Sequence, residues 1–207
     1  MNKRSILGIS ASCLIGVALI LGIINFSNKN VGVEKKVIGS RSQNAISFDR
    51  IPIQSVDNLV NLADIVVIGK VSTDAVTREE QLPKLPEGGG GGIQYLASTQ
   101  IEIQKVLYGK PVSDVITYNQ LGKAGSDDGQ TKVKKGEKVL LVLKYTGKSN
   151  EYASVALEEG VFYVKDTGKA RSQSDNTILS KYDNKDFSIL EEDFNKSTYA
   201  KKSKLDN

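Results

Sequence analysis

The sequence contains no histidine, no tryptophan and only one cysteine among its 207 residues. Histidine is the commonest general base and metal ligand, so its absence excludes Ser-His-Asp and Cys-His catalysis and the usual zinc sites. A single cysteine excludes a disulfide within the chain and any cluster of cysteine ligands. An enzyme of this composition would have to use carboxylates or a Ser–Lys pair, and no motif marks such a pair.

A strong charge imbalance is also missing. The chain has 28 basic and 24 acidic residues, and the first 26 residues hold two of the basic ones and none of the acidic ones. The remainder is therefore close to neutral, with 26 basic against 24 acidic side chains. A nucleic-acid-binding protein concentrates basic side chains on one face. No such concentration is visible, and we predict no nucleic-acid partner.

The longest apolar run lies near the N-terminus. Residues 6–26 carry no charge over 21 positions, and roughly 20 suffice to span a bilayer as a helix. The apolar region of a cleaved signal is usually about 7–15 residues long and ends at a small-x-small site, which this run lacks. Lys3 and Arg4 before the run favour a cytoplasmic N-terminus. We predict a single-pass anchor in the cell membrane with the bulk of the chain extracytoplasmic; a cleaved, secreted form is the alternative.

Cys13 lies inside this run, with Ser10 where a lipoprotein signal would have leucine. It is therefore interpreted as an apolar thiol of the anchor rather than a lipid attachment site.

The rest of the chain divides by composition. Residues 1–27 form the predicted anchor, 28–47 a polar stalk, 48–170 a β-barrel domain and 171–207 a polar, largely disordered tail with one helical stretch around 186–199. Weak docking of this tail on the barrel is the alternative to disorder. A short helix is expected over 55–63, because Ser55 is a suitable N-cap and apolar residues follow at helical spacing.

Strand patterns dominate the barrel domain. The runs 65–71 and 137–145 are apolar at almost every position, which is typical of strands buried on both faces. Residues 95–107 alternate strictly and then slip by one near Val106, as a β-bulge would cause. Further strands are expected at 114–120, 151–157 and 160–165. Five or six strands without a strong helix between them indicate an all-β barrel or sandwich.

A long connection, 72–94, separates the first two predicted strands and contains five consecutive glycines, Gly88–Gly92. The glycines lack the Gly-Lys-Ser/Thr ending and following helix of a phosphate-binding loop. We interpret the connection as a flexible linker; a ligand-contacting flap is the alternative.

Three segments carry a resemblance to a known family. Ala63-Asp64 enters the first strand, the long second strand ends in Lys105, Val106, Leu107 and Gly109, and Gly136-Glu137 precedes the fourth strand. Together they resemble the netrin-like domain, the OB-type barrel also used by tissue inhibitors of metalloproteinases and similar to bacterial exported domains. The resemblance covers 55–165 and implies a five- to six-stranded OB-type barrel with one short N-terminal helix. The free N-terminal cysteine and the disulfides of those inhibitors have no counterpart here, so their inhibitory mechanism is not implied.

OB-type barrels bind ligands on the face of strands two and three and through the adjoining loops. On this chain that face predicts eight ligand-binding residues: Gln94, Tyr95, Gln100, Glu102, Gln104, Tyr118, Gln120 and Tyr145. The predicted function is a non-catalytic binding module that needs no cofactor and contacts a protein or an envelope polymer.

Paired carboxylates are the residues on which an enzymatic function would depend. Asp127-Asp128 precedes a glycine and is typical of a turn, and the strand-like placement of Glu158-Glu159 would send the two carboxylates to opposite faces. We therefore predict no catalytic residues and no metal site. An envelope-acting hydrolase or transferase that uses Asp127 or Glu158 stays as an alternative, and a structural spacer subunit is a third.

Overall fold

A computed structural model describes residues 52–84, 90–126, 131–174 and 176–205. The predicted anchor and stalk lie outside these ranges, as do most of the glycine run and Asp127-Asp128. None of the helices within the described ranges combines the length and the apolar character that a membrane span requires.

Five strands close into a barrel in the order β1-β3-β4-β6-β5, and β5 pairs back with β1. All neighbours are antiparallel except β4 and β6, which run parallel. The predicted mainly β barrel with a short helix before it is therefore confirmed. The barrel strands are β1 (Ile65–Val71), β3 (Gly90–Tyr108), β4 (Val115–Leu121), β5 (Lys138–Tyr145) and β6 (Glu151–Ser154).

Within the described ranges, three more strands extend the sheet to eight, against the five or six expected. β2 (Val76–Lys84) pairs with the first half of β3, β7 (Val161–Val164) pairs with β5, and β8 (Ala170–Ser172) pairs with β7. The prediction of a flexible linker over 72–94 is wrong for 76–84 and 90–94, because these segments form an antiparallel hairpin. Two short 3-10 helices follow the strands: η1 (Leu157–Gly160) connects β6 to β7, and η2 (Ser180–Tyr182) lies between β8 and α3.

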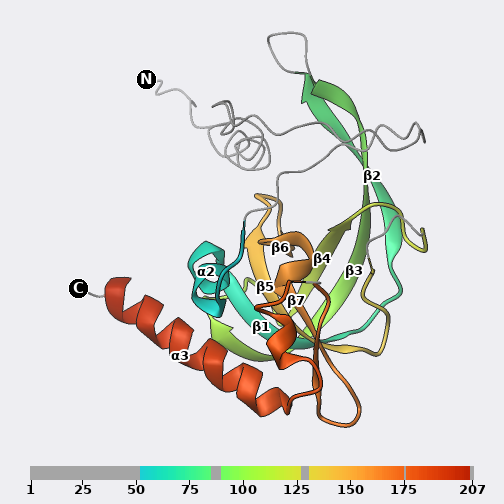
Figure 1. Cartoon of the computed structure of the whole chain (residues 1–207). Helices are drawn as coiled ribbons and strands as arrows, with labels where there is room; N and C mark the ends of the chain where they lie inside the picture. The colour runs from blue at the N-terminus through green and yellow to red at the C-terminus, as the bar shows by residue number, and fades with distance from the viewer. Residues whose placement is uncertain (1–51, 85–89, 127–130, 175, 206–207) are drawn as a thin grey trace, which may run out of the picture. The chain divides into compact units, whose positions relative to one another are not determined.

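The central residues of β1 and β5 are apolar on both faces because the two strands separate two cores. One set of their side chains fills the barrel interior, where it meets Ile101, Ile116 and Tyr118. The alternate set lies under two helices, α2 (Val56–Leu62) and α3 (Phe187–Leu205), which Figure 1 shows on the same side of the barrel. The interior set is Ile65, Val67, Leu141 and Leu143, and the set under the helices is Val66, Ile68, Leu140 and Val142.

Two β-bulges let β3 curve around β1. The register shifts beside Val66/Val67 and beside Ile68/Gly69, which confirms the slip expected near Val106. At the second shift a Cβ on Gly69 would lie 2.5 Å from Cγ2 of Ile101. Glycine is therefore required there by the close approach of β3.

Both ends of α2 are capped. The Ser55 hydroxyl accepts a hydrogen bond from the Asn58 amide, as the sequence predicts. At the other end the Lys201 ammonium, from α3, donates to the carbonyls of Val60 and Ala63 at 2.9 and 2.8 Å. The same ammonium lies 4.2 Å from the centroid of the Tyr108 ring. This lysine satisfies helix carbonyls that otherwise need water, and it joins α3 to α2.

The expectation of a largely disordered tail over 171–207 is wrong for the part that the structure describes, whereas the helical stretch expected around 186–199 is confirmed by α3. α3 buries Phe187, Leu190 and Phe194, and the Phe194 ring packs edge-on against Phe162 at 5.6 Å between centroids. The boundary at 170 also divides β8. These apolar residues are few but lie three and four positions apart, so they form one stripe along the helix.

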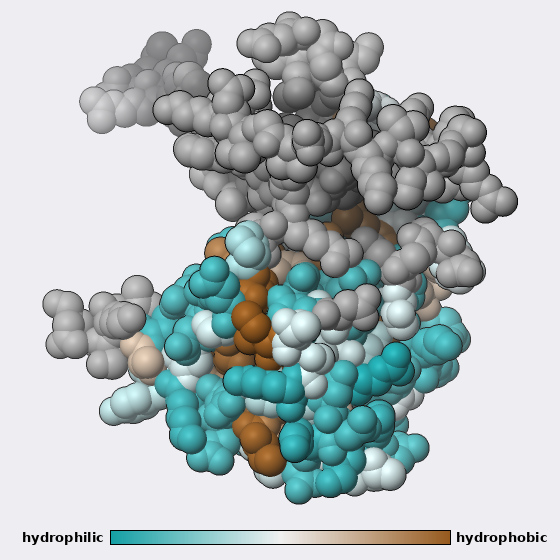
Figure 2. All heavy atoms as spheres, viewed as in Figure 1, coloured by the Kyte–Doolittle hydropathy of each residue, from teal (hydrophilic) through white to brown (hydrophobic). Residues whose placement is uncertain are grey.

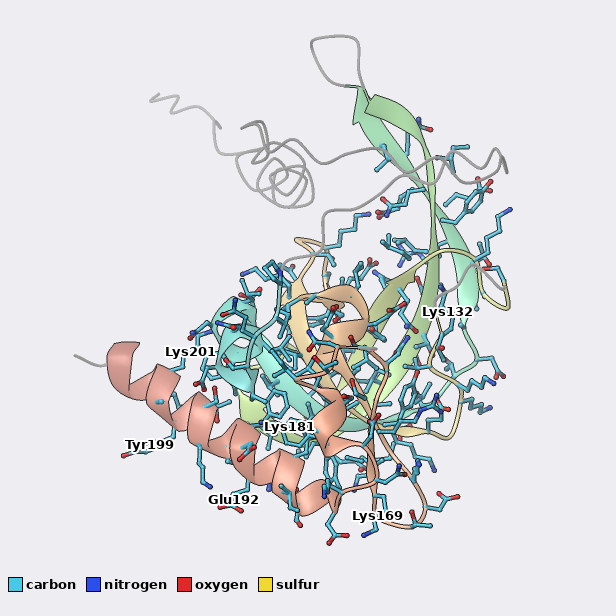
Figure 3. All side chains as sticks on the ribbon, in the orientation of Figure 1. Lys132, Lys169, Lys181, Glu192, Tyr199 and Lys201 are labelled. Atoms are coloured by element: carbon cyan, nitrogen blue, oxygen red, sulfur yellow. The ribbon has the colours of Figure 1, made fainter. Side chains whose placement is uncertain are left out.

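The stripe explains why so polar a helix docks. Figure 3 shows Lys201 directed toward α2 and Tyr199 pointing away from the barrel. Figure 2 shows a mostly hydrophilic surface on this side of the molecule, with one narrow hydrophobic strip. Of the apolar side chains of α3, Phe187, Leu190 and Phe194 are buried against the barrel, whereas Ile189 is 46% exposed.

We expect Phe194→Ala to lower the free energy of unfolding by about 3–5 kcal/mol, because it empties a buried aromatic site. Tyr199→Ala is the matched control on the same helix, where the side chain is 77% exposed, and should change stability by less than about 0.5 kcal/mol. Urea unfolding followed by circular dichroism measures both. Equal unfolding midpoints for the two variants would show that α3 does not contribute to the core.

Candidate functional site

The hairpin of β2 with residues 90–98 of β3 projects from the barrel in Figure 1, and we call it the arm. Its register pairs Arg78 with Leu96 and Glu80 with Gln94, so these side chains share one side of the arm. That side continues onto the outer face of the barrel, because Ser98, Gln100 and Glu102 of β3 point outward while Ala97, Thr99 and Ile101 point in. The arm therefore extends the outer face beyond the barrel.

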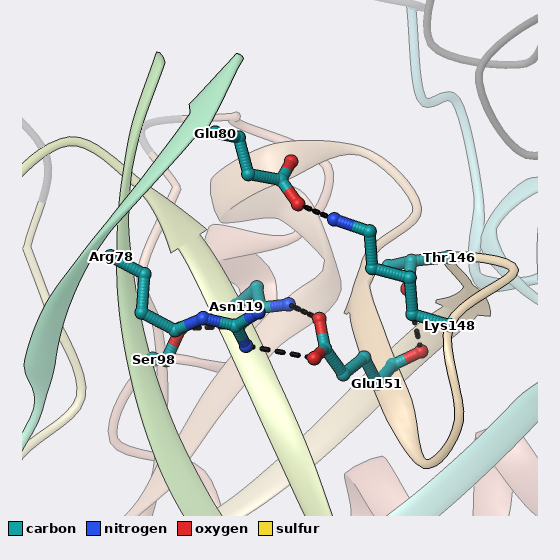
Figure 4. A network of polar contacts seen from close by, with 7 residues as sticks. All are labelled: Arg78, Glu80, Ser98, Asn119, Thr146, Lys148 and Glu151. Carbon is teal, nitrogen blue, oxygen red and sulfur yellow. Dashed lines mark hydrogen bonds and ion pairs between the residues drawn. The ribbon is translucent and has the colours of Figure 1, made fainter. Parts of the chain in front are cut away.

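A row of polar side chains crosses the outer face where the arm begins (Figure 4). Arg78 donates to one carboxylate oxygen of Glu151 at 2.8 Å, and the Asn119 amide donates to the other at 3.0 Å. The Ser98 hydroxyl donates to the Asn119 carbonyl oxygen at 2.6 Å. These four residues, the polar row, come from four adjacent strands, β2, β3, β4 and β6. Its members are far apart in the sequence and meet only through the strand order.

The arm is also held at a second point. Lys148, in the turn between β5 and β6, forms an ion pair with Glu80 of the arm. We call this pair and the Arg78–Glu151 pair the clasp. Strands lie about 4.8 Å apart, so β2 and β6 are separated by roughly 14 Å of sheet. The long side chains of Arg78 and Glu151 must therefore lie flat over the face, which leaves Ser98 and Asn119 buried beneath them.

Beyond the polar row, the outer face of β3 is open. Gln100, Glu102 and Gln104 are exposed, as the predicted binding face requires. Val76 also lies on this side, opposite Ser98, and is 63% exposed. An apolar side chain beside three polar ones gives a surface that can both exclude water and donate or accept hydrogen bonds.

Two predicted residues lie on the arm. Gln94 is half-buried on the side that carries Glu80. Tyr95 is half-buried on the opposite side, where the Lys123 ammonium lies 4.1 Å from its ring centroid. Ile93, two residues earlier on that side, is 53% exposed and was not predicted. The arm thus exposes an apolar residue and a cation-covered ring away from the outer face.

Three predicted residues serve the fold. The prediction of Tyr118 as a contact residue is wrong as the structure stands, because it is 1% exposed inside the barrel. The Gln120 amide holds the loop before β5, accepting from the Val133 amide and donating to the Thr131 carbonyl. Tyr145 is exposed, but its backbone amide donates to Asp64 and its ring packs edge-on against Tyr152.

The motifs behind the family resemblance have structural roles here. The Asp64 carboxylate accepts from the Lys144 ammonium and the Tyr145 amide, both at 2.9 Å, and so joins the start of β1 to the end of β5. Glu137 accepts from the Lys134 amide and closes the turn at Gly136, whose φ is +90°. A Cβ on Gly109 would collide with the Asp64 carbonyl. These motifs stabilise the closed barrel, and their contacts do not by themselves indicate a chemical activity.

The alternative catalytic residues are only partly described. Asp127 lies outside the described residues. Glu158 and Glu159 occupy η1 instead of a strand, and Glu159 is buried. Within the described ranges, no three Asp, Glu or Cys side chains come close enough to hold a metal ion.

Sequence reasoning missed the polar row entirely. Arg78, Asn119 and Glu151 are separated by 41 and 32 positions, and none belongs to a motif. The only available signal was the outward alternation of Ser98 with Gln100, which had already placed β3 correctly. No protein-family model and no curated protein sequence matches this chain.

The tyrosines give a test of barrel integrity. Burial raises the pKa of Tyr118 well above its usual value near 10, and the neighbouring Tyr163 hydroxyl adds to the shift. Because the folded state favours the neutral phenol, its contribution to stability holds below pH 10 and declines as pH rises further. We expect Tyr118→Phe to reduce this decline and Tyr199→Phe to leave it unchanged, as measured by urea unfolding between pH 8 and pH 11. Identical slopes for the two variants would contradict the burial of Tyr118.

Proposed function

We propose that this chain is a membrane-anchored, extracytoplasmic and non-catalytic binding module of OB/netrin-like type. Its ligand is a protein or an envelope polymer that contacts the outer face of β3 and the arm. The ring order of the strands, with one parallel pair between the third and fifth barrel strands, is the arrangement of OB-type barrels and supports this assignment. In such barrels the outer face of the second and third strands and the adjoining loops take the ligand.

The observation that carries the proposal is the combination of an open, mixed polar and apolar face with an arm held beside it. Gln100, Glu102 and Gln104 are exposed on the strand that corresponds to the second OB strand, and Val76 flanks them. The arm and the turn at Lys148 correspond to the two ligand-contacting loops of an OB-type barrel. Both loops thus meet over the same face.

The membrane part of the proposal comes from the sequence. The uncharged run 6–26 is long enough to span a bilayer, and the basic residues before it favour export of everything that follows. A binding face near the membrane would then meet partners in the envelope.

The experiment compares two triple variants of the full-length protein in native membranes. Q100A/E102A/Q104A removes the exposed side chains of the outer face, and S188A/E192A/N195A removes two neutral polar groups and one carboxylate from the exposed side of α3. Both should fold like the wild type, because exposed substitutions usually change stability by less than about 0.5 kcal/mol.

We expect crosslinked recovery of a specific partner to fall at least about tenfold for the outer-face variant and to stay unchanged for the α3 variant, where tenfold corresponds to about 1.4 kcal/mol. Quantitative mass spectrometry of the crosslinked material measures this. Equal recovery with both variants and the wild type would remove the outer face as the binding site. Loss with the α3 variant alone would favour the spacer alternative, in which the helix makes the contact.

A further inference from the structure

Within the polar row, the Glu151 carboxylate is bound as a ligand carboxylate would be. One oxygen accepts a hydrogen bond from the Arg78 guanidinium, and the other accepts one from the Asn119 amide. Its side chain is 14% exposed, whereas that of Arg78 is 39% exposed. A guanidinium and an amide that meet the two oxygens of one carboxylate form an arrangement suited to anion recognition. Ser98 fixes the Asn119 amide by donating to its carbonyl oxygen.

We propose that Arg78 and Asn119 form a carboxylate-binding subsite which Glu151 occupies from within, and that an acidic side chain of an extended protein segment displaces it. This inference rests on the proposed function, because it places the subsite at one end of the same outer face. The ligand is identified by chemistry: an aspartate or glutamate presented by a chain in β conformation.

The spacing of the outer face favours a peptide as the source of the carboxylate. Ser98, Gln100 and Glu102 follow one another at every second position of β3, about 6.8 Å apart. Alternate side chains of an extended peptide repeat at the same distance. A peptide aligned with β3 would place one acidic side chain over Arg78. The next side chains on the same side of the peptide would then reach the exposed glutamines of β3.

Displacement of Glu151 requires the clasp to open. Glu151 begins β6 directly after the turn that contains Lys148, so movement of this turn shifts both clasp pairs together. Glu80 and Lys148 are the other charged groups of the clasp. Because they neutralise each other, they do not change the net charge around Arg78 and Glu151. A ligand can bind only those molecules in which Glu151 has left the subsite. Its apparent affinity is therefore reduced in proportion to the fraction of such molecules.

Substitution of Glu151 isolates the effect. Glu151→Gln preserves shape but leaves the Arg78 charge without a counter-ion on a partly buried face. Glu80→Gln is the matched control, because it removes the same charge from the same clasp and leaves the Glu151 carboxylate in the subsite. Arg78→Gln combined with Glu151→Gln removes the guanidinium and should cancel any gain.

The test uses full-length protein in detergent and a fluorescent, capped Ala-Glu-Ala-Glu-Ala peptide, with its Gln counterpart and glucuronate as further probes. We expect Glu151→Gln to bind the acidic peptide at least about tenfold more tightly than the wild type, measured by fluorescence anisotropy. Glu80→Gln should change affinity less than about threefold, and the double variant should return to the wild-type value. The Gln peptide should show no gain.

Three results would overturn the inference. Equal affinity of Glu151→Gln and wild type for the acidic peptide, with both folded by circular dichroism, would make the pair purely structural. An equal gain in Glu80→Gln would show that net charge or a loosened clasp, and not the Glu151 carboxylate in the subsite, sets the affinity. A gain for glucuronate as competitor equal to that for the peptide would assign the subsite to a sugar acid instead. These outcomes are independent of the partner-recovery experiment, since loss of partner recovery in the outer-face variant can coexist with an unaltered Glu151→Gln.

Discussion

Pairing of β1 with β5 closes the barrel, and both strands are buried on both faces. This constraint determines the rest of the architecture, because a strand with two apolar faces needs a covering layer on each side. The barrel interior supplies one layer, and α2 with α3 supplies the other. The Asp64 carboxylate fixes the register at one end of the pair by binding the Lys144 ammonium and the Tyr145 amide. The helices therefore occupy the β1–β5 side and the C-terminal end of β3, where Leu107 and Tyr108 are buried. Within the described residues, the outer face of β4 and of the Ser98–Glu102 part of β3 is left without a helical cover.

The two sides of the molecule are held by different forces. On the helical side, apolar burial and the Lys201 contacts to α2 fix the geometry, and a change there costs core packing. On the side of the arm, charged and polar side chains add the outer-face contacts across strands β2, β3, β4 and β6, which are also joined by their backbone ladders. Fully satisfied polar networks specify one arrangement, but they lose their advantage when one member leaves. The difference makes the arm the more easily displaced part of the fold.

Local patterns predicted the elements that leave a clear signal in a short stretch of sequence. The runs 65–71 and 137–145, the Ser55 cap and the slip near Val106 were all found because each leaves a signal within a few residues. β2 was missed because Arg78, Glu79, Glu80 and Pro83 contradict strand propensity, and only pairing with β3 and the clasp make it a strand. The helix of α3 was predicted, but its docking on the barrel stayed open beside disorder, because only three buried apolar residues carry it. Of the predicted site residues, Gln100, Glu102 and Gln104 are exposed on the outer face, whereas Tyr118 is buried inside the barrel. Tyr118 was assigned to the wrong side because alternation alone does not say which face of a strand is exposed to solvent.

The strength of the clasp bears on what the arm can do. Ion pairs between partly exposed side chains contribute about 0–1 kcal/mol each, because water screens them and two long side chains lose freedom. Arg78 and Lys148 are both more than one-third exposed, so both clasp pairs fall in this range. Two such pairs would keep the arm closed in most molecules and leave a minor open population. Apolar packing of similar extent would be worth several times more and would hold the arm permanently. An arm fastened by charges rather than by apolar side chains is thus suited to a face that must be both protected and reached.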